Sequence, residues 1–184
     1  MPDSLSAPSV PEGLSFSPVV TARLDDVAEW CRDRGQRLTE TRRQILGLIL
    51  SHDRPSGAYD LLGRLRPVHP NVAPPTVYRA LDFLLEHGLI HRLERLSAFV
   101  ACSHAVVCHH GCDHGEWGVH RAQFLICREC GRAWELEQET VAPALMTAAR
   151  KVGFRAEAAT VEIEGLCAAC QKDGSIAAPT AGHG

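Results

Sequence analysis

The sequence of 184 residues is short of lysine, long apolar runs and a signal-like start. Lysine occurs only at Lys151 and Lys172, so nearly all positive charge is carried by arginine. No apolar run reaches the roughly 18 residues that a membrane helix needs. The N-terminal segment MPDSLSAPSVPEGLSFSP has neither a basic start nor a long apolar stretch, which argues against a secretory signal. We therefore expect a cytoplasmic protein without a membrane span.

A large net charge of either sign is also missing, because 19 basic and 22 acidic residues leave −3. The distribution of charge along the chain is more informative than the net charge. Arginines gather in residues 21–96, where basic residues slightly outnumber acidic ones, whereas residues 97–184 are acidic. This asymmetry is compatible with a nucleic-acid-binding face in the first half of the chain.

Hydrophobic residues make up 45% of the chain, enough for a packed core. Residues 1–20 and 173–184 are rich in Ser, Pro, Gly or Ala without periodicity, and we expect two flexible tails there. The eight cysteines lie in a chain without an export signal, and four of them form two CxxC pairs. This pattern favours metal binding over disulfides.

The first half predicts four helices followed by a hairpin. We expect helices starting at Thr21, at Thr39 and at Ser56 as capping residues, and a fourth, TVYRALDFLLEH, that follows Pro74 and Pro75 and ends at Gly88. After Gly88 the apolar period changes from helical to alternating, which predicts two strands over 89–94 and 97–102. Residues 21–102 therefore predict a winged helix-turn-helix domain.

The fourth helix has two distinct faces. Apolar residues at helical spacing, namely Val77, Ala80, Leu81 and Leu84, predict its buried stripe. That spacing leaves Tyr78, Arg79 and Asp82 on the outward side, where a DNA-reading helix would need them.

The second half predicts a smaller α/β domain. Residues 103–120 form an expected hinge and extended loop rich in His and Cys. Residues 121–172 predict strands over 122–127 and 133–137, a helix from Thr140 to about Val152, and a strand within 154–165 that alternates at Val161 and Ile163. The fold class is then α+β, with a winged-helix domain followed by a small α/β domain.

Two CxxC pairs are the strongest chemical signal in the sequence. Cys127 and Cys130 form one pair, and Cys167 and Cys170 the other. Two-residue spacing lets both thiolates of a pair face one ion, and two pairs complete the tetrahedron that zinc prefers. Four thiolates leave no open coordination position, so the site is predicted to be structural rather than catalytic.

Other potential metal ligands are less well defined by spacing. One group comprises His91, Cys102, His120 and Glu135, a mixed set that suits zinc, but neighbouring histidines could replace any member. A second group lies in the loop and is also compatible with a polar loop that binds metal adventitiously; it comprises Cys108, His109, His110, Cys112, Asp113 and His114.

The stretch PPTVYRALDFLLEHGLIHRLE, together with the two CxxC pairs and the GLCAAC ending, resembles the ferric uptake regulator family over roughly residues 23–171. Within the family it is most similar to the zinc uptake regulator branch. The resemblance implies a winged-helix DNA-binding domain, a hinge and an α/β dimerisation domain. It also implies a homodimer that binds double-stranded operator DNA when zinc is present and represses zinc-uptake genes.

The resemblance assigns roles to individual residues. The four paired cysteines match the structural zinc site of the family, and His91, Cys102, His120 and Glu135 match the regulatory zinc site of the zinc branch. Tyr78 and Arg79 match the DNA-contacting pair on the recognition helix, and Thr76 precedes them. Cys108, His110, Cys112, Asp113 and His114 remain candidates for an accessory site.

Two departures from the family pattern affect these assignments. The loop between Cys102 and His120 is longer than the pattern leads us to expect, which leaves His114 as a rival to His120. Ala159 stands near the position of a ligand histidine in iron- and peroxide-sensing relatives, and together with Cys102 it favours zinc over iron.

Two alternative functions follow from the same residues. An iron- or peroxide-responsive regulator of the same family would keep the fold and change the metal. A zinc hydrolase would need an open metal position and a general base, but the sequence has neither HExxH nor an HxE motif paired with PCxxC. We therefore expect no enzyme and no small-molecule substrate other than metal ions.

Overall fold

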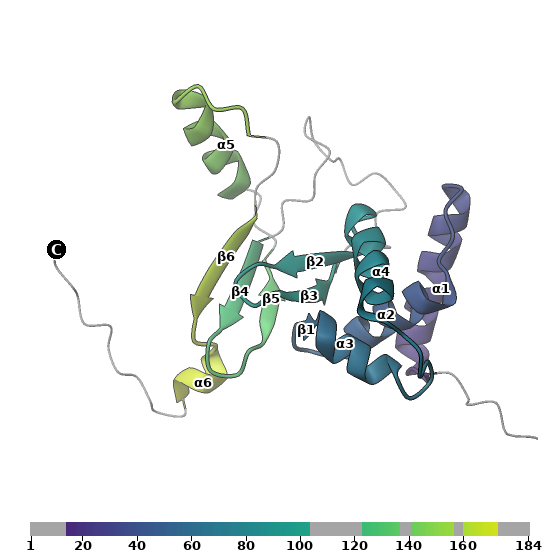
Figure 1. Ribbon diagram of the computed structural model, residues 1–184. Coiled ribbons are helices and arrows are strands. Elements are labelled where there is room, and N and C mark those ends of the chain that lie inside the picture. The colour runs from purple at the N-terminus through teal and green to yellow at the C-terminus, as the bar shows by residue number, and fades with distance from the viewer. Residues whose placement is uncertain (1–13, 104–122, 137–140, 157–159, 173–184) are drawn as a thin grey trace, which may run out of the picture.

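The computed structural model describes residues 14–103, 123–136, 141–156 and 160–172. Two domains follow one another along the chain (Figure 1). The first contains α1 (Pro18–Asp33), α2 (Glu40–Leu50), β1 (Ser56–Gly57), α3 (Ala58–Leu65), α4 (Pro74–Glu86), β2 (Ile90–Leu93) and β3 (Ala98–Ala101). The second contains β4 (Gln123–Cys127), β5 (Ala133–Glu135), α5 (Val141–Lys151), β6 (Val161–Gly165) and α6 (Ala168–Lys172). The α+β class expected from the sequence is confirmed.

Helix α1 begins at Pro18 rather than at Thr21. Ser17 is its capping residue, because the Ser17 hydroxyl accepts the Val20 N–H at 3.3 Å and Pro18 fits the first helical turn. The expected tail over residues 1–20 is thus too long. Phe16 packs against the core beside Gly47, where a Cβ atom would collide with the Phe16 ring.

Ser56 does not cap the third helix as expected. Ser56 and Gly57 form a short strand that pairs antiparallel with β3, and Gly57 is the capping residue of α3. The two-residue strand is too short to leave an alternating pattern in the sequence. It completes a three-stranded sheet in the order β1-β3-β2.

The core of the first domain confirms the stripe predicted for α4. Val77, Ala80, Leu81 and Leu84 are buried and pack against apolar residues of α1, α2 and α3. Gly88 has a φ of +64°, the left-handed conformation that ends a helix favourably with glycine. The chain then enters the β2–β3 hairpin, and helices α3 and α4 followed by this wing form the expected winged helix-turn-helix.

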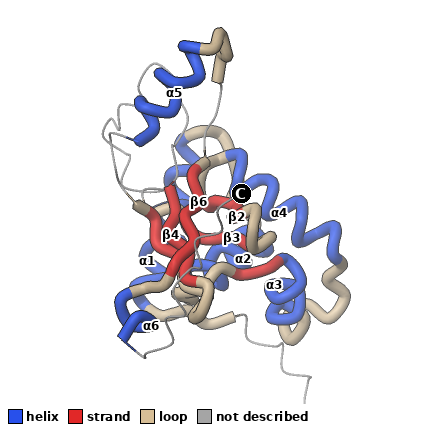
Figure 2. Tube along the Cα trace, turned by 90° about the vertical axis from the view of Figure 1, so that its left-hand side faces the viewer, coloured by secondary structure: helices blue, strands red, loops and turns tan. Residues whose placement is uncertain are grey.

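The second domain is built on a three-stranded sheet in the order β5-β4-β6. Strand β4 pairs antiparallel with β5 and parallel with β6. Strand β6 starts at Val161, so the strand expected within 154–165 is confirmed only at its alternating end. The short helix α6 was not expected. Helix α5 stands apart from the sheet in both Figure 1 and Figure 2.

The two domains meet through the wing. Figure 2 shows the strands of both sheets next to one another at the centre of the molecule. Leu93 of the wing packs with Phe124 and Ile126 of β4, and all three are buried. Among the helices of the described residues, none is long and apolar enough to cross a bilayer.

Candidate metal centres and nucleic-acid face

The four paired cysteines lie together at one end of the second sheet. Cys127 ends β4 and Cys130 follows in a tight turn, where Gly131 has a φ of +66° and donates its N–H to the Cys127 carbonyl at 2.9 Å. Cys167 follows β6, and Cys170 lies in α6. Because β4 and β6 run parallel and side by side, both pairs arrive at the same edge.

The cysteine geometry fits a tetrahedral zinc ion. All four Sγ atoms lie within 4.8 Å of one another. The Sγ atoms of Cys130 and Cys167 are 3.9 Å apart. Sulfur atoms at about 2.3 Å from a tetrahedral zinc would be separated by about 3.8 Å. The unexpected helix α6 is what turns Cys170 back toward Cys167.

The electrostatics of this cluster also favour a cation. Backbone N–H groups of Cys130 and Cys167 point at the Cys127 sulfur and lower the pKa of that thiol to about 6. Hydrogen bonding to the Cys167 sulfur raises the pKa of Cys170 to about 12. Four thiolates so close together repel one another, so the cluster can be fully ionised only around a positive ion.

A second group of potential ligands spans the two domains. His91 comes from β2 and Cys102 follows β3 in the wing, whereas Glu135 ends β5 in the second domain. One ligand atom from each lies within 4.8 Å of the other two. His91 Nε2 and Glu135 Oε1 are 3.5 Å apart, close to the roughly 3.4 Å expected for nitrogen and oxygen ligands of one tetrahedral zinc.

Burial and hydrogen bonding set the charges at this second site. Burial by itself would lower the pKa of His91, but hydrogen bonds to Cys102 and Glu135 outweigh it and raise the pKa to about 9. Burial would raise the pKa of Glu135, but contacts with His91 and Ser103 lower it to about 2. Without metal, the pair is therefore an ion pair between the domains near neutral pH.

Ser103 is a residue of this site that sequence reasoning missed. Its backbone N–H and its hydroxyl both donate to Glu135 Oε2, at 3.0 Å and 2.7 Å. A serine after a candidate ligand carries no spacing signal of its own. Its role becomes visible only when the wing and β5 are brought together.

The remaining ligand candidates lie outside the described residues. These are His120 and its rival His114, together with Cys108, His109, His110, Cys112 and Asp113. Ala159 also lies outside them. The described part of the chain thus supplies three members of the expected quartet.

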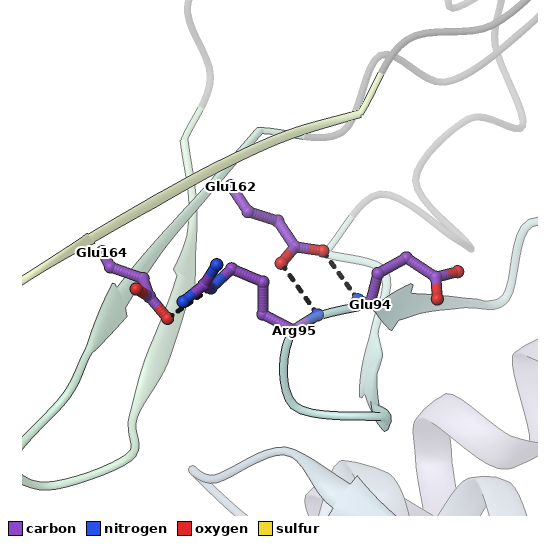
Figure 3. Close-up of polar contacts among 4 residues, drawn as sticks. All are labelled: Glu94, Arg95, Glu162 and Glu164. Atoms are coloured by element: carbon purple, nitrogen blue, oxygen red, sulfur yellow. Dashed lines mark hydrogen bonds and ion pairs between the residues drawn. The ribbon is translucent and has the colours of Figure 1, made fainter.

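The turn of the wing also contacts strand β6 (Figure 3). The backbone N–H groups of Glu94 and Arg95 donate to the two Glu162 carboxylate oxygens, at 2.7 Å and 3.3 Å. Arg95 Nε donates to Glu164 Oε1 at 2.7 Å. We call these contacts of Glu94, Arg95, Glu162 and Glu164 the wing latch.

The predicted DNA-facing residues lie on the open face of α4. Thr76, Tyr78 and Arg79 are exposed, and 44% of the Tyr78 surface remains accessible although it is a large aromatic residue. The buried stripe holds the opposite face of the helix against the core. An exposed helix of this kind can enter a DNA major groove.

Comparisons with known proteins agree with this architecture. A profile of the "Ferric uptake regulator family" matches residues 33–164. The "Zinc uptake regulation protein" of Escherichia coli (strain K12) is 41% identical over 140 residues, covering 76% of each chain.

Two solved structures are similar over most of their length. A zinc uptake regulator complexed with zinc and DNA matches with a TM-score of 0.76 and 36% identity, covering 85% of this chain and 98% of that one. Holo XcZur matches with a TM-score of 0.71 and 41% identity, covering 82% of this chain and 98% of that one. The profile spans both domains and the fold is shared, so this chain belongs to the ferric uptake regulator family.

Proposed function

We propose that this protein is a zinc-responsive transcriptional repressor that binds palindromic operator DNA as a homodimer and switches off zinc-uptake genes. The observation that carries the proposal is the group of His91, Cys102 and Glu135, which takes ligands from both domains. One ion held by all three requires a single relative pose of the wing and the second domain. The proposed role is regulatory rather than catalytic, and the proposed location is the cytoplasm.

The chemistry of the ligands supports zinc as the metal. A thiolate, an imidazole and a carboxylate form the mixed tetrahedral set that zinc accepts. The named relative from Escherichia coli is a zinc uptake regulator, and the solved relative contains zinc and DNA. These findings favour zinc over an iron- or peroxide-responsive regulator. We propose His120 as the fourth ligand.

The two metal centres have different proposed roles. Cys127, Cys130, Cys167 and Cys170 belong to one domain and tie α6 and the end of β6 to the turn after β4, which is a structural role. The second site joins two domains, which is a regulatory role. Zinc bound at the second site favours the closed pose by its higher affinity for that pose.

The closed pose is useful for DNA binding because it fixes the orientation of α4. Tyr78 and Arg79 would meet base edges, and neighbouring arginines would contact phosphates. In a two-fold dimer, both recognition helices must match the spacing of two half-sites. A chain whose domains rotate freely loses orientational entropy when it binds DNA, whereas the closed chain has its domains already fixed.

Exposed apolar side chains of the second domain support the dimer. Leu125, Trp134 and Ile163 lie on the sheet and are 38%, 41% and 49% exposed, and they line one apolar hollow. Leu145 of α5 and Phe154 beyond it are 45% and 63% exposed. Exposed apolar side chains gathered on one domain are the kind of surface that a protein–protein interface buries.

The test compares Cys102→Ser with Cys127→Ser. Both variants lose one thiolate, so each is the control for the other. We expect Cys102→Ser to stay a folded dimer with one zinc per chain and to lose zinc-dependent operator binding. Cys127→Ser should lose dimerisation and thermal stability, because zinc in a closed site contributes folding energy.

Operator binding should be titrated against buffered free zinc, on a DNA fragment selected with the zinc-loaded full-length protein. Metal content and mass in solution should be measured in parallel. A Cys102→Ser variant that responds to zinc like the wild type would overturn the regulatory role of the second site. A Cys127→Ser variant that remains dimeric and equally stable would overturn the structural role of the first.

A further inference from the structure

Ser103 occupies one oxygen of the Glu135 carboxylate completely. A carboxylate oxygen has two lone pairs, and Glu135 Oε2 accepts both the Ser103 N–H at 3.0 Å and the Ser103 hydroxyl at 2.7 Å. A metal ion would have to displace one of these donors to reach Oε2. The other oxygen, Oε1, lies 3.5 Å from His91 Nε2 and faces the proposed ligands.

This division of the carboxylate limits the coordination number of the site. A carboxylate that offers one oxygen contributes one ligand, whereas a carboxylate that offers two raises the coordination number by one. Zinc is satisfied with four ligands in a tetrahedron. Manganese and iron more often take five or six, with a larger share of oxygen.

We propose that Ser103 is a specificity-determining residue that keeps Glu135 a one-oxygen ligand and thereby favours four-coordinate zinc over ions of higher coordination number. The inference rests on the proposed regulatory site. Ser103 directly follows Cys102, so the segment that supplies the thiolate also sets the binding mode of the carboxylate from the other domain. Ser103 is exposed and lies outside the core, so we expect its substitution to leave the fold intact.

The experiment uses the full-length dimer with one zinc per chain already bound, and Co²⁺ as a spectroscopic probe of the second site. Wild type, Ser103→Ala and Ser103→Thr are compared. Tetrahedral Co²⁺ gives intense visible bands, and five-coordinate Co²⁺ gives weaker ones. Zn²⁺ and Mn²⁺ affinities are measured by competition with a chelating indicator.

We expect the tetrahedral spectrum in wild type and in Ser103→Thr, which keeps the hydroxyl. Ser103→Ala frees one lone pair of Oε2, so its spectrum should weaken. Its preference for Zn²⁺ over Mn²⁺ should fall by about tenfold, the lower end of the effects of residues that orient metal ligands. The readouts are spectral shape and affinity ratio, which a residue with a merely structural role would leave unchanged.

Two outcomes would overturn the inference. One is a Ser103→Ala variant with the wild-type spectrum and affinity ratio, and the other is an equal loss of Zn²⁺ and Mn²⁺ affinity with an unchanged spectrum. Failure of the proposed function has a different appearance, because the wild type itself would then take up no Co²⁺ beyond the zinc-filled cysteine site.

Discussion

Arg79 lies on the face of α4 that the core leaves open, beside Tyr78. An arginine that donates two hydrogen bonds to a guanine discriminates against other bases by about 1–3 kcal/mol. We expect Arg79→Ala to weaken specific operator binding by about tenfold or more. Zinc content and dimer mass should not change, because Arg79 is exposed on α4 and belongs to neither metal-ligand group.

The matched control is Arg155→Ala, which removes an exposed arginine of the second domain. Binding of operator and of unrelated DNA should be measured for both variants at the same salt concentration, since phosphate contacts depend strongly on salt. Equal operator affinity for Arg79→Ala and wild type would show that α4 is not the recognition helix.

Single residues differ in how far the sequence reveals their role. Cys127 and Cys130 were identifiable because a two-residue spacing already brings two sulfurs together within one turn. His91 and Glu135 come from strands of different domains, so spacing alone could not select them and a family resemblance was needed. Ser103 was invisible in the sequence because its partner is distant along the chain.

The wing latch is a contact between two elements, the turn after β2 and strand β6. Arg95 and Glu164 are partly exposed and form an ion pair at 2.7 Å. Exposed pairs contribute little to folding, but this pair also opposes separation of the domains. We expect Arg95→Glu to raise the free zinc needed for half-maximal operator occupancy by about two- to fivefold.

The double variant Arg95→Glu with Glu164→Arg should return the zinc response toward wild type, since it restores an opposite-charge pair. Glu94→Ala is the control, because the Glu94 side chain pairs with Arg92 inside the wing at 3.2 Å. The response is read as operator occupancy against buffered zinc. Identical curves for all four proteins would show that the latch does not influence closure.

At the scale of elements, periodicity located long helices and strands and missed short ones. The four apolar positions of α4 predicted its existence and its buried face, and Gly88 predicted its end, which lies at Glu86. Strand β1 and helix α6 are too short to show a period, and each exists because a neighbour fixes it. Strand β3 pairs with β1, and the turn after β6 positions α6.

At the scale of the whole molecule, the wing carries contacts between the two domains in the described part of the chain. Its strands contribute Leu93 to the apolar contact with Phe124, and His91 to the metal-ligand group. Its turn contributes the latch. In the described part of the chain, these contacts all come from one hairpin and the residues that directly follow it, which neither helical periodicity nor motif spacing could reveal.

The last prediction concerns competition between protons and zinc for His91. The His91 pKa is raised to about 9, whereas its ordinary value is near 6.5. The stability that protonated His91 contributes through its ion pair with Glu135 is thus fully present below pH 6.5 and is lost as pH rises through 9. The Glu135 pKa is lowered to about 2, so the stability that the ionised Glu135 carboxylate contributes is fully present above about pH 4.5. That stability is lost as pH falls toward 2.

With the cysteine site zinc-filled and the second site metal-free, the closed pose should therefore loosen as the pH rises from 6.5 to above 9. The radius of gyration from X-ray scattering should rise over that range. His91→Gln should remove the rise, whereas His52→Gln, at an exposed histidine, should keep it.

Zinc affinity should increase over the same pH range in which the metal-free pose loosens, because a metal-bound imidazole must release its proton. Well below pH 9, zinc affinity should rise at least tenfold per pH unit, and calorimetry in buffers of different ionisation enthalpy counts the protons released. An NMR titration midpoint near 6.5 for His91 in the metal-free site would contradict the ion pair and both pH trends derived from it.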